Sequence, residues 1–314
     1  MKIFDAVATR EALPFDALID ALACMFVEGC EVPLRHAHTL VAADGAQGTV
    51  LIMPAWRADR YLGIKTVNIF PGNALRGLPG LFSTYMLYDA RTGAPLAQMD
   101  GDQITSRRTA AASALAASLL ARRDARRLLV VGAGRVAALI PQAYREVLRI
   151  EEVRVWARTP AQAAARVDEW RAAGIDAQVA PDLAEAAAQA DVVSCATLAT
   201  APLIQGGWLR AGSHLDLIGS FTPQMREADD ACFDAAGVFV DTDEAIAKSG
   251  DLLGPISRGV LLASDIRGTL ADLCRGAEPG RRSVDERTVF KSVGTALEDL
   301  AAATLVYEGG AQPP

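Results

Sequence analysis

The chain has 314 residues, of which 51% are hydrophobic and 22% charged, and its formal net charge is −7. This is enough chain for two domains with hydrophobic cores, and the composition is typical of a globular protein. The negative balance gives no electrostatic reason to bind nucleic acid or an anionic membrane. No apolar run is long enough to span a bilayer, and Asp5 interrupts the start where a signal peptide needs an apolar core, so we expect a cytoplasmic protein.

The cysteines and histidines do not form a recognisable metal-binding pattern. The five cysteines are scattered without a C-x-x-C pair, and the chain has three histidines. A structural zinc site uses ligands in close pairs. His36 and His38 alternate as residues on one strand face do, which fits core or surface histidines better than ligands. We therefore predict no metal.

The first third of the chain predicts a small α+β domain. Apolar residues recur at helical spacing over 14–27, and Gly29 is a plausible end for that helix. Short apolar runs separated by turn residues then follow at 38–42, 49–53, 61–69, 82–88 and 95–99. Consecutive strands with brief turns indicate an antiparallel or mixed sheet.

An alanine-rich helix over 104–121 leads into a different architecture. Leu128 to Val131 form an apolar run of strand length, and Gly132-Ala133-Gly134-Arg135-Val136-Ala137 follows directly, with a helical pattern continuing towards Leu148. Strand, glycine-rich turn and helix in this order match the G-x-G-x-x-G/A dinucleotide-binding pattern. Gly132 allows the tight turn, Gly134 allows backbone to approach a pyrophosphate, and Ala137 allows close packing of the helix. The pyrophosphate is expected at the helix N-terminus.

Strands and helices continue to alternate beyond this motif. We expect helices at 160–173 and 183–189 and strands at 153–159, 178–180, 191–197, 214–218 and 238–240. This alternation predicts a Rossmann-type, doubly wound parallel sheet, in addition to the smaller α+β domain. The last stretch, 289–307, has a helical period and is predicted as one helix.

The end of the second strand bears on which nucleotide is bound. An NAD site usually has an acid there for the ribose 2′-hydroxyl, whereas an arginine accommodates a 2′-phosphate. This chain has Arg158 and Thr159 at that point, which favours NADP(H) and leaves NAD(H) possible. The alternative is that Arg158 is a solvated loop residue and that Thr159 caps the helix whose first residue is Pro160.

In an open parallel sheet, ligands bind beyond the carboxyl ends of the strands. Thr197, Ile218 and Gly219 lie at such ends and are predicted to face the cofactor, with ordinary loop chemistry as the alternative. In the first domain, Arg35, Lys65 and Arg108 are cations in apolar surroundings. A buried cation needs a partner, which is either an internal acid or an anionic substrate.

Several stretches together resemble the ornithine cyclodeaminase/mu-crystallin family along nearly the whole chain. They are MPAW at Met53, YLGIKTVNIFPGN at Tyr61, ITSRRTAAASALAA, VVGAGRVA and VFKSVGTALEDLAAA. The resemblance implies that Arg35, Lys65 and Arg108 surround a substrate carboxylate, with Lys65 and Arg108 catalytic. The guanidinium of Arg108 can bind a carboxylate through two parallel hydrogen bonds. Burial could lower the pKa of Lys65 and make it a proton donor.

The resemblance also implies a domain arrangement and a homodimer. We expect a substrate-binding and dimerisation domain over 1–118 together with 292–314, and a dinucleotide domain over 119–291. Thr109 and Ser292, which lie in the matching stretches, are added to the predicted cofactor-binding residues.

Two positions depart from the cyclodeaminase pattern. Phe221 stands where cyclodeaminases have an aspartate that handles the amine of ornithine, and Gly80 stands where they have a hydroxyl residue. The resemblance therefore favours the ketimine reductase branch, which reduces Δ1-pyrroline-2-carboxylate and Δ1-piperideine-2-carboxylate to proline and pipecolate. The alternatives are ornithine cyclodeaminase, archaeal-type alanine dehydrogenase and an NADPH-dependent small-ligand binding protein.

Overall fold

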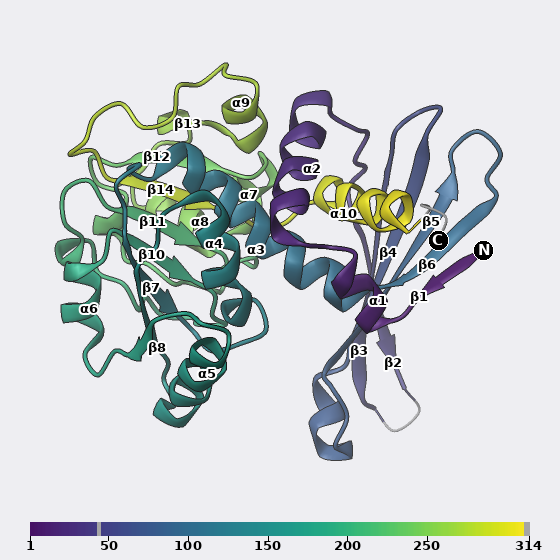
Figure 1. Cartoon of the computed structure of the whole chain (residues 1–314), viewed down its shortest axis with the longest axis horizontal. Coiled ribbons are helices and arrows are strands. Elements are labelled where there is room, and N and C mark those ends of the chain that lie inside the picture. The colour runs from purple at the N-terminus through teal and green to yellow at the C-terminus, as the bar shows by residue number, and fades with distance from the viewer. Residues whose placement is uncertain (43–44, 311–314) are drawn as a thin grey trace. The chain divides into compact units, whose positions relative to one another are not determined.

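The computed structural model describes residues 1–42 and 45–310. They form two compact units (Figure 1), Met1–Arg108 with Thr295–Pro314 and Thr109–Gly294. The sequence predicts the division after residues 118 and 291, and the structure divides the chain after 108 and 294. Of the predicted first domain, residues 43–44 and 311–314 lie outside the described part.

The first unit is built on a mixed six-stranded sheet, as the succession of short strands predicts. Its order is β1-β6-β5-β4-β3-β2, in which β1 runs parallel to β6 and the other neighbours are antiparallel. The strands are β1 (Lys2–Phe4), β2 (His36–Val41), β3 (Gln47–Trp56), β4 (Tyr61–Ile69), β5 (Leu81–Asp89) and β6 (Pro95–Asp100). The helical segments are α1 (Ala6–Glu11), α2 (Phe15–Glu28), the 3₁₀ turn η1 (Pro71–Arg76) and α10 (Ala296–Gly309).

The two faces of this sheet have different environments. Along β4 the residues Gly63, Lys65 and Val67 are buried, whereas Leu62 and Ile64, which alternate with them, are half-exposed. Side chains alternate across a strand, so one face is the core face. Helix α10 packs against α2 and against β3, β4 and β5 (Figure 1), and it carries Asp299 onto the face that holds Lys65.

The second unit contains a parallel eight-stranded sheet with the order β13-β12-β14-β11-β10-β7-β8-β9. The chain moves outward from β7 to β9 and then returns to the other side of β7, so the strand order reverses between β7 and β10. Ligands bind at such a switch point in open parallel sheets. The strands are β7 (Arg127–Val131), β8 (Glu152–Trp156), β9 (Ala177–Val179), β10 (Val192–Cys195), β11 (His214–Leu217), β12 (Gly237–Val240), β13 (Ile266–Thr269) and β14 (Thr288–Lys291).

Helices alternate with these strands, as expected for a Rossmann-type unit. They are α4 (Ile140–Val147), α5 (Pro160–Ala172), α6 (Leu183–Gln189), α7 (Glu244–Lys248), α8 (Gly250–Ser257) and α9 (Leu270–Cys274). Short 3₁₀ segments are η2 (Ala137–Leu139), η3 (Gly206–Trp208), η4 (Asp230–Cys232) and η5 (Ala263–Asp265). The alanine-rich helix α3 (Gly101–Leu120) starts in the first unit and continues into the second.

The helix after the glycine-rich turn begins later than predicted. The turn passes through η2 before regular helix starts at Ile140. Pro141 has no N–H to donate to the carbonyl of Ala137, so an unbroken α-helical ladder cannot run through this point.

The prediction of one helix over 289–307 is wrong in its first part. Val289 to Lys291 belong to the buried strand β14, which pairs with β11 on one side and β12 on the other. The helix begins only at Ala296, after Gly294 at φ +76° and Thr295, whose side chain accepts a hydrogen bond from the N–H of Leu297. Pairing with two distant strands overrides a local apolar pattern that fits either helix or buried strand.

Candidate functional site

Two basic and two acidic side chains of the first unit form a buried ion-pair cluster. Lys65 Nζ on β4 lies 2.7 Å from Asp299 Oδ2 on α10. Arg108 on α3 donates from Nε to Asp299 Oδ1 at 2.9 Å and from Nη1 to Glu298 Oε2 at 2.5 Å. Lys65 is 2% exposed, Arg108 5%, and both acids 0%. The structure thus brings together two of the predicted substrate residues and pairs both with acids of the first turn of α10.

Burial and charge shift the titration of this cluster. Burial lowers the pKa of Lys65 to about 8 because it penalises the ammonium, and nearby Arg108 adds to this while Asp299 opposes it. Burial alone would raise the pKa of Asp299, but the adjacent charges of Lys65 and Arg108 outweigh it and hold that pKa below its ordinary value. A lysine that titrates near neutral pH beside a charged carboxylate can hold an anion and exchange a proton.

Tyr85 brings a hydroxyl group to the same face of the sheet. It lies directly opposite Lys65 in the β4–β5 register and is 1% exposed. Its Oη has no hydrogen-bond partner among the described residues. The phenol lies against Gly63, where a Cβ atom would collide with Oη. Burial raises the pKa of Tyr85 well above its usual value, so the group is a neutral O–H.

Arg35, the third predicted substrate residue, is half-buried directly before β2. Its role at the substrate remains a prediction. Gly80 lies directly before β5 and is exposed, and a Cβ atom there would lie 3.8 Å from the carbonyl oxygen of Phe70, an ordinary contact distance.

The glycine-rich turn of the second unit has the geometry that a dinucleotide needs. Gly132 follows β7 with φ +118°, and a Cβ atom there would lie 2.6 Å from the carbonyl oxygen of Ala196 after β10. Glycine is therefore required by backbone conformation and by space. Gly134 is exposed, and no atom of the described residues lies within 4 Å of the position that a Cβ atom would take there. Ala137 is fully buried. This open turn at the switch point fits a pyrophosphate.

The predicted residues around this turn lie at the same edge of the sheet. Val136 and Ala133 are half-buried and Arg135 is exposed. Strand β8 ends at Trp156, earlier than predicted, and Arg158 and Thr159 are exposed beyond it. Thr159 occupies the N-cap position of α5, but within the described chain its side chain makes no capping hydrogen bond. Both side chains are thus available to a ligand group at the ribose.

A buried glutamate joins the ends of β10 and β11. Glu227 Oε1 accepts hydrogen bonds from the N–H of Thr197 at 2.7 Å and from its Oγ1 at 2.8 Å, and Oε2 accepts from the N–H of Gly219 at 2.6 Å. Burial raises the pKa of Glu227 to about 8, with Lys291 opposing the shift and Asp251 adding to it. The sequence predicts that Thr197 faces the cofactor. In the structure its hydroxyl donates to Glu227 instead of being free to donate to a ligand.

Other predicted cofactor residues lie near this junction. Ile218 is buried directly after β11, and Ser292 is buried after β14. The loop beyond Ser292 is held by Asp241, which accepts from the N–H groups of Val293 at 2.8 Å and Gly294 at 2.6 Å. Thr109 is half-buried on α3.

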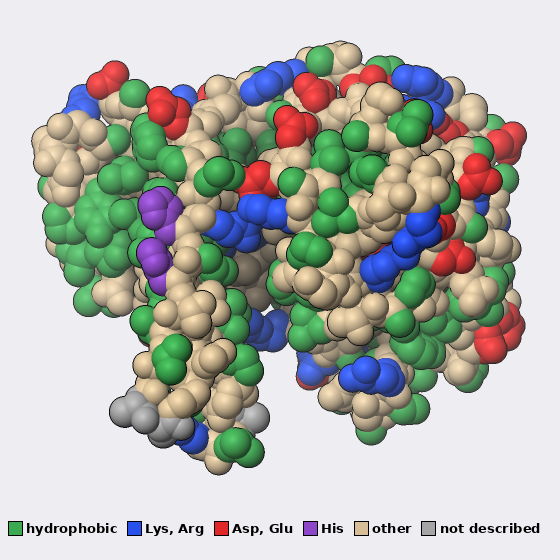
Figure 2. Space-filling model, turned by 180° about the vertical axis from the view of Figure 1, so that it is seen from behind, with side chains coloured by type: hydrophobic (Ala, Val, Ile, Leu, Met, Phe, Trp, Pro, Cys, Tyr) green, Lys and Arg blue, Asp and Glu red, His purple; other side chains and the backbone are tan. Residues whose placement is uncertain are grey.

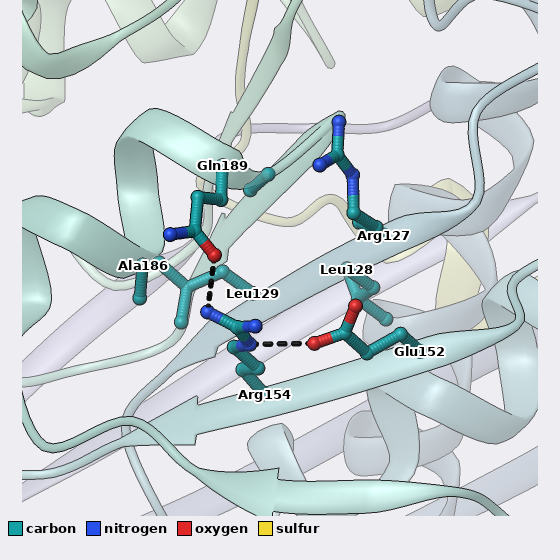
Figure 3. Close-up of a pocket in the computed structure, with 8 residues that line it drawn as sticks. Arg127, Leu128, Leu129, Glu152, Arg154, Ala186 and Gln189 are labelled. Carbon is teal, nitrogen blue, oxygen red and sulfur yellow. Dashed lines mark hydrogen bonds and ion pairs between the residues drawn. The ribbon is translucent and has the colours of Figure 1, made fainter.

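A small pocket at the opposite edge of the sheet is structural. It is lined by residues near the starts of β7 and β8 and by the end of α6 (Figure 3). In it Arg154 donates to Glu152 Oε1 at 2.6 Å and to Gln189 Oε1 at 2.6 Å. It lies away from the carboxyl ends of the strands, where ligands bind.

Sequence reasoning missed the acidic partners of the site. Glu298 and Asp299 are adjacent acids in an alanine-rich apolar helix, and that isolation is a signal in the sequence. Glu227 has no comparable signal, because it follows Arg226 in a polar loop.

The described residues contain neither a metal-ligand cluster nor a membrane-spanning helix. Over residues 1–42 and 45–310, no three His, Cys, Asp or Glu side chains are grouped as metal ligands. No helix in these ranges is long and apolar enough to cross a membrane.

Comparison with known proteins gives matches along almost the full chain. The model of the ornithine cyclodeaminase/mu-crystallin family matches residues 5–312. A Δ1-pyrroline-2-carboxylate reductase of Paracoccus denitrificans is 43% identical, with coverage of 87% of this chain and 89% of that protein.

Two solved structures are similar over their whole length. The Δ1-pyrroline-2-carboxylate reductase of Thermococcus litoralis, in complex with NADH and L-proline, has a TM-score of 0.91 at 33% identity and covers 98% of this chain and 97% of that one. An archaeal alanine dehydrogenase dimer with bound NAD has a TM-score of 0.89 at 30% identity and covers 99% and 96%.

Proposed function

Since the chain belongs to the ornithine cyclodeaminase/mu-crystallin family, we propose that it is an NAD(P)H-dependent reductase of cyclic ketimines. The substrates are Δ1-pyrroline-2-carboxylate and Δ1-piperideine-2-carboxylate, and the products are L-proline and L-pipecolate. The observation that carries this proposal is the 43% identity to a Δ1-pyrroline-2-carboxylate reductase over 87% of the chain.

The geometry of the first unit supports the substrate class. Lys65 and Arg108 are buried cations next to each other, and such a pair suits the carboxylate of an imino acid. Lys65, with its pKa near 8, is the proposed proton donor to the ring nitrogen. Phe221, at the edge where cyclodeaminases have an acid, is 46% exposed and offers no proton-accepting group.

The bound nicotinamide supplies a hydride to the imine carbon. The chain's own part is to hold the carboxylate, orient the C=N bond and keep the nitrogen protonated. Gly132 and Gly134 are proposed to bind the pyrophosphate through backbone, while Thr197, Ile218 and Gly219 are proposed to line the nicotinamide half.

Relatives of known structure bind NADH or NAD. We propose that this chain prefers NADP(H). Arg158 and Thr159 are exposed at the end of β8, and no acid stands at Ala157, Arg158 or Thr159 to bind a ribose 2′-hydroxyl. Arg158 can pair with the 2′-phosphate.

We also propose a homodimer formed through the outer face of the first unit's sheet. That face carries large apolar side chains that are half-exposed: Ile52, Pro54, Trp56, Leu62, Ile64, Met86 and Tyr88. Hydrophobic side chains gather in this unit beside the histidines (Figure 2). An apolar face of this kind marks an interaction surface. Light scattering should give twice the 33.1 kDa chain mass, and Ile64→Glu should give monomers.

The decisive experiment follows NADPH absorbance with Δ1-pyrroline-2-carboxylate. Parallel assays measure ammonia released from ornithine and NADPH oxidation with pyruvate plus ammonia. Rapid oxidation with the imine and neither other activity supports the reductase. Ammonia from ornithine would make the chain a cyclodeaminase, and turnover of pyruvate would make it an alanine dehydrogenase. Binding of imine without any turnover would support a ligand-binding protein. Cytoplasmic location, also proposed, is tested by cell fractionation.

A further inference from the structure

The loops after β10 and β11 meet at the edge of the parallel sheet where ligands bind. Thr197 follows β10 and Gly219 follows β11, and a Cβ atom at Gly219 would lie 2.0 Å from the carbonyl oxygen of Thr197. The loop after β10 also meets the glycine-rich turn, because a Cβ atom at Gly132 would lie 2.6 Å from the carbonyl oxygen of Ala196. The three segments are therefore packed backbone against backbone, and a shift of one changes the space that all of them leave for a cofactor.

Glu227 joins two of these segments through both oxygens of its carboxylate. Oε1 accepts from the N–H and the hydroxyl of Thr197 at 2.7 and 2.8 Å, and Oε2 accepts from the N–H of Gly219 at 2.6 Å. Glu227 is fully buried. All three groups donate, so the arrangement needs an acceptor at both ends of the side chain, which a carboxylate provides and an amide does not.

Other buried groups hold Glu227 in place. Asp251 Oδ1 on α8 accepts from the N–H of Glu227 at 2.8 Å, and the carbonyl oxygen of Glu227 accepts from the N–H of Leu203 at 2.8 Å. Lys291 Nζ at the end of β14 donates to the carbonyl oxygen of Leu217 at 2.9 Å and lies 3.6 Å from Asp251 Oδ2. A side chain supported in this way can hold the segments that it binds within a narrow range of positions.

We propose that Glu227 is a positioning residue for hydride transfer, which fixes the loops after β10 and β11 relative to each other and thereby the nicotinamide ring that they line. Hydride transfer depends steeply on geometry, and a misplacement of about 1 Å can cost about a hundredfold in rate. This inference rests on the proposed function for the reaction and for the place of the nicotinamide beside Thr197 and Gly219. The alternative is that Glu227 only satisfies buried N–H groups and stabilises the fold.

Glu227→Gln tests the proposal because it keeps the shape of the side chain and removes one acceptor. The amide NH2 must face either Thr197 or Gly219, where it meets a backbone N–H from which it cannot accept. One of the two loops therefore loses its hydrogen bond. We expect kcat for Δ1-pyrroline-2-carboxylate to fall about a hundredfold, with a larger primary isotope effect from NADPH deuterated at the transferred position and an unchanged KM for the imine.

Asp191→Asn is the matched control. Asp191 is also a buried carboxylate of the second unit, and it accepts from two backbone N–H groups, those of Arg126 and Arg127, at 3.0 and 2.9 Å. It lies at the opposite edge of the sheet, because it directly precedes β10 and Arg127 is the first residue of β7. This variant should melt at a lower temperature than the wild type and keep the wild-type kcat and isotope effect.

A second readout does not require turnover. 2′-Phospho-ADP-ribose is NADPH without its nicotinamide ring, so the ratio of its Kd to the Kd of NADPH measures what that ring contributes to binding. Both compounds are titrated by calorimetry into the full-length protein. In Glu227→Gln the ratio should shrink by about fivefold, a size typical of one lost hydrogen bond, while the Kd of 2′-phospho-ADP-ribose stays at the wild-type value.

The outcomes separate this inference from the proposed function. An unchanged kcat or an unchanged ratio in Glu227→Gln overturns it, and so does an equal loss of kcat in Asp191→Asn. Equal losses of affinity for both nucleotides also overturn it, because they indicate general damage to the fold. A wild type that does not reduce the imine, with a ratio that shrinks in Glu227→Gln, would end the reductase proposal and support the positioning of the nicotinamide. If Glu227→Gln does not fold, Glu227→Asp carries the same test, because its side chain is one CH2 shorter and reaches only one of the two loops.

Discussion

Replacing Arg108 with alanine should destabilise the first unit and weaken substrate binding. Arg108 bonds Asp299 at 2.9 Å and Glu298 at 2.5 Å, and both carboxylates are fully buried. Removing one partner of a buried ion pair costs about 3–5 kcal/mol because a charge stays buried without compensation. At about 2–4 °C per kcal/mol, this corresponds to a fall in Tm of roughly 6–20 °C.

The measurement is thermal melting together with the KM for Δ1-pyrroline-2-carboxylate and the Kd for NADPH. We expect KM to rise by about a hundredfold, as for loss of a charge-assisted fork, with little change in the Kd. Arg107→Ala is the matched control. Arg107 is the neighbouring buried arginine, but it donates to the carbonyl oxygen of Leu13 and stacks on Phe15, at 4.2 Å from the ring centroid. The assignment is refuted if both variants raise KM equally or if Arg108→Ala keeps the wild-type KM.

The stability loss should depend on pH with a defined sign. The pKa of Asp299 is lowered in the folded protein, so its contribution to stability is present above its ordinary pKa near 3.8 and is lost as the pH falls through the folded value. Arg108 supplies part of that contribution. The difference in Tm between wild type and Arg108→Ala should therefore be larger at pH 7 than at a pH well below 3.8.

Three further outcomes are expected. Gly132→Ala should lower the free energy of unfolding by about 1–3 kcal/mol and weaken NADPH binding, because φ is +118° and the Cβ would lie 2.6 Å from the Ala196 carbonyl oxygen. Gly134→Ala has open space for its Cβ, so it should keep the wild-type Tm and weaken only NADPH binding. Equal losses of Tm in the two variants would contradict this. Arg158→Ala should raise the KM for NADPH about tenfold and leave that for NADH unchanged, and a parallel rise in both would argue against a 2′-phosphate contact. The wild-type kcat/KM for the imine should fall as the pH rises through about 8, because Lys65 loses its proton there. Lys65→Met should lower kcat about a hundredfold and abolish this fall at high pH. If the fall persists in the variant, another group causes it.

The sequence does not predict which of the adjacent residues Arg107 and Arg108 pairs with the buried acids. Arg107 and Arg108 are adjacent on one alanine-rich helix and have the same chemistry. Packing alone directs one towards Leu13 and Phe15 and the other towards Glu298 and Asp299. The resemblance to a family selected Arg108, but no local pattern in the chain separates the two.

Local signals predicted the core of the nucleotide unit. An apolar run of strand length, two glycines two residues apart and a following helical pattern lie within about twenty residues, and each is decided by short-range sterics. The alternation of strands and helices beyond it similarly indicated the parallel sheet. The same local signals predict a helix over 289–307, although Thr288–Lys291 is a strand inside the sheet.

The sequence by itself determined the class of fold, the position of the nucleotide turn and the identity of the cations Lys65 and Arg108. These follow from residue type, periodicity and short spacing, and from motifs of a family. Only the tertiary structure decided that both cations are neutralised by Glu298 and Asp299, nearly two hundred residues away from Arg108. Ion pairs between distant segments depend on how the sheet and helices pack, and no periodicity in the chain records which acid meets which cation.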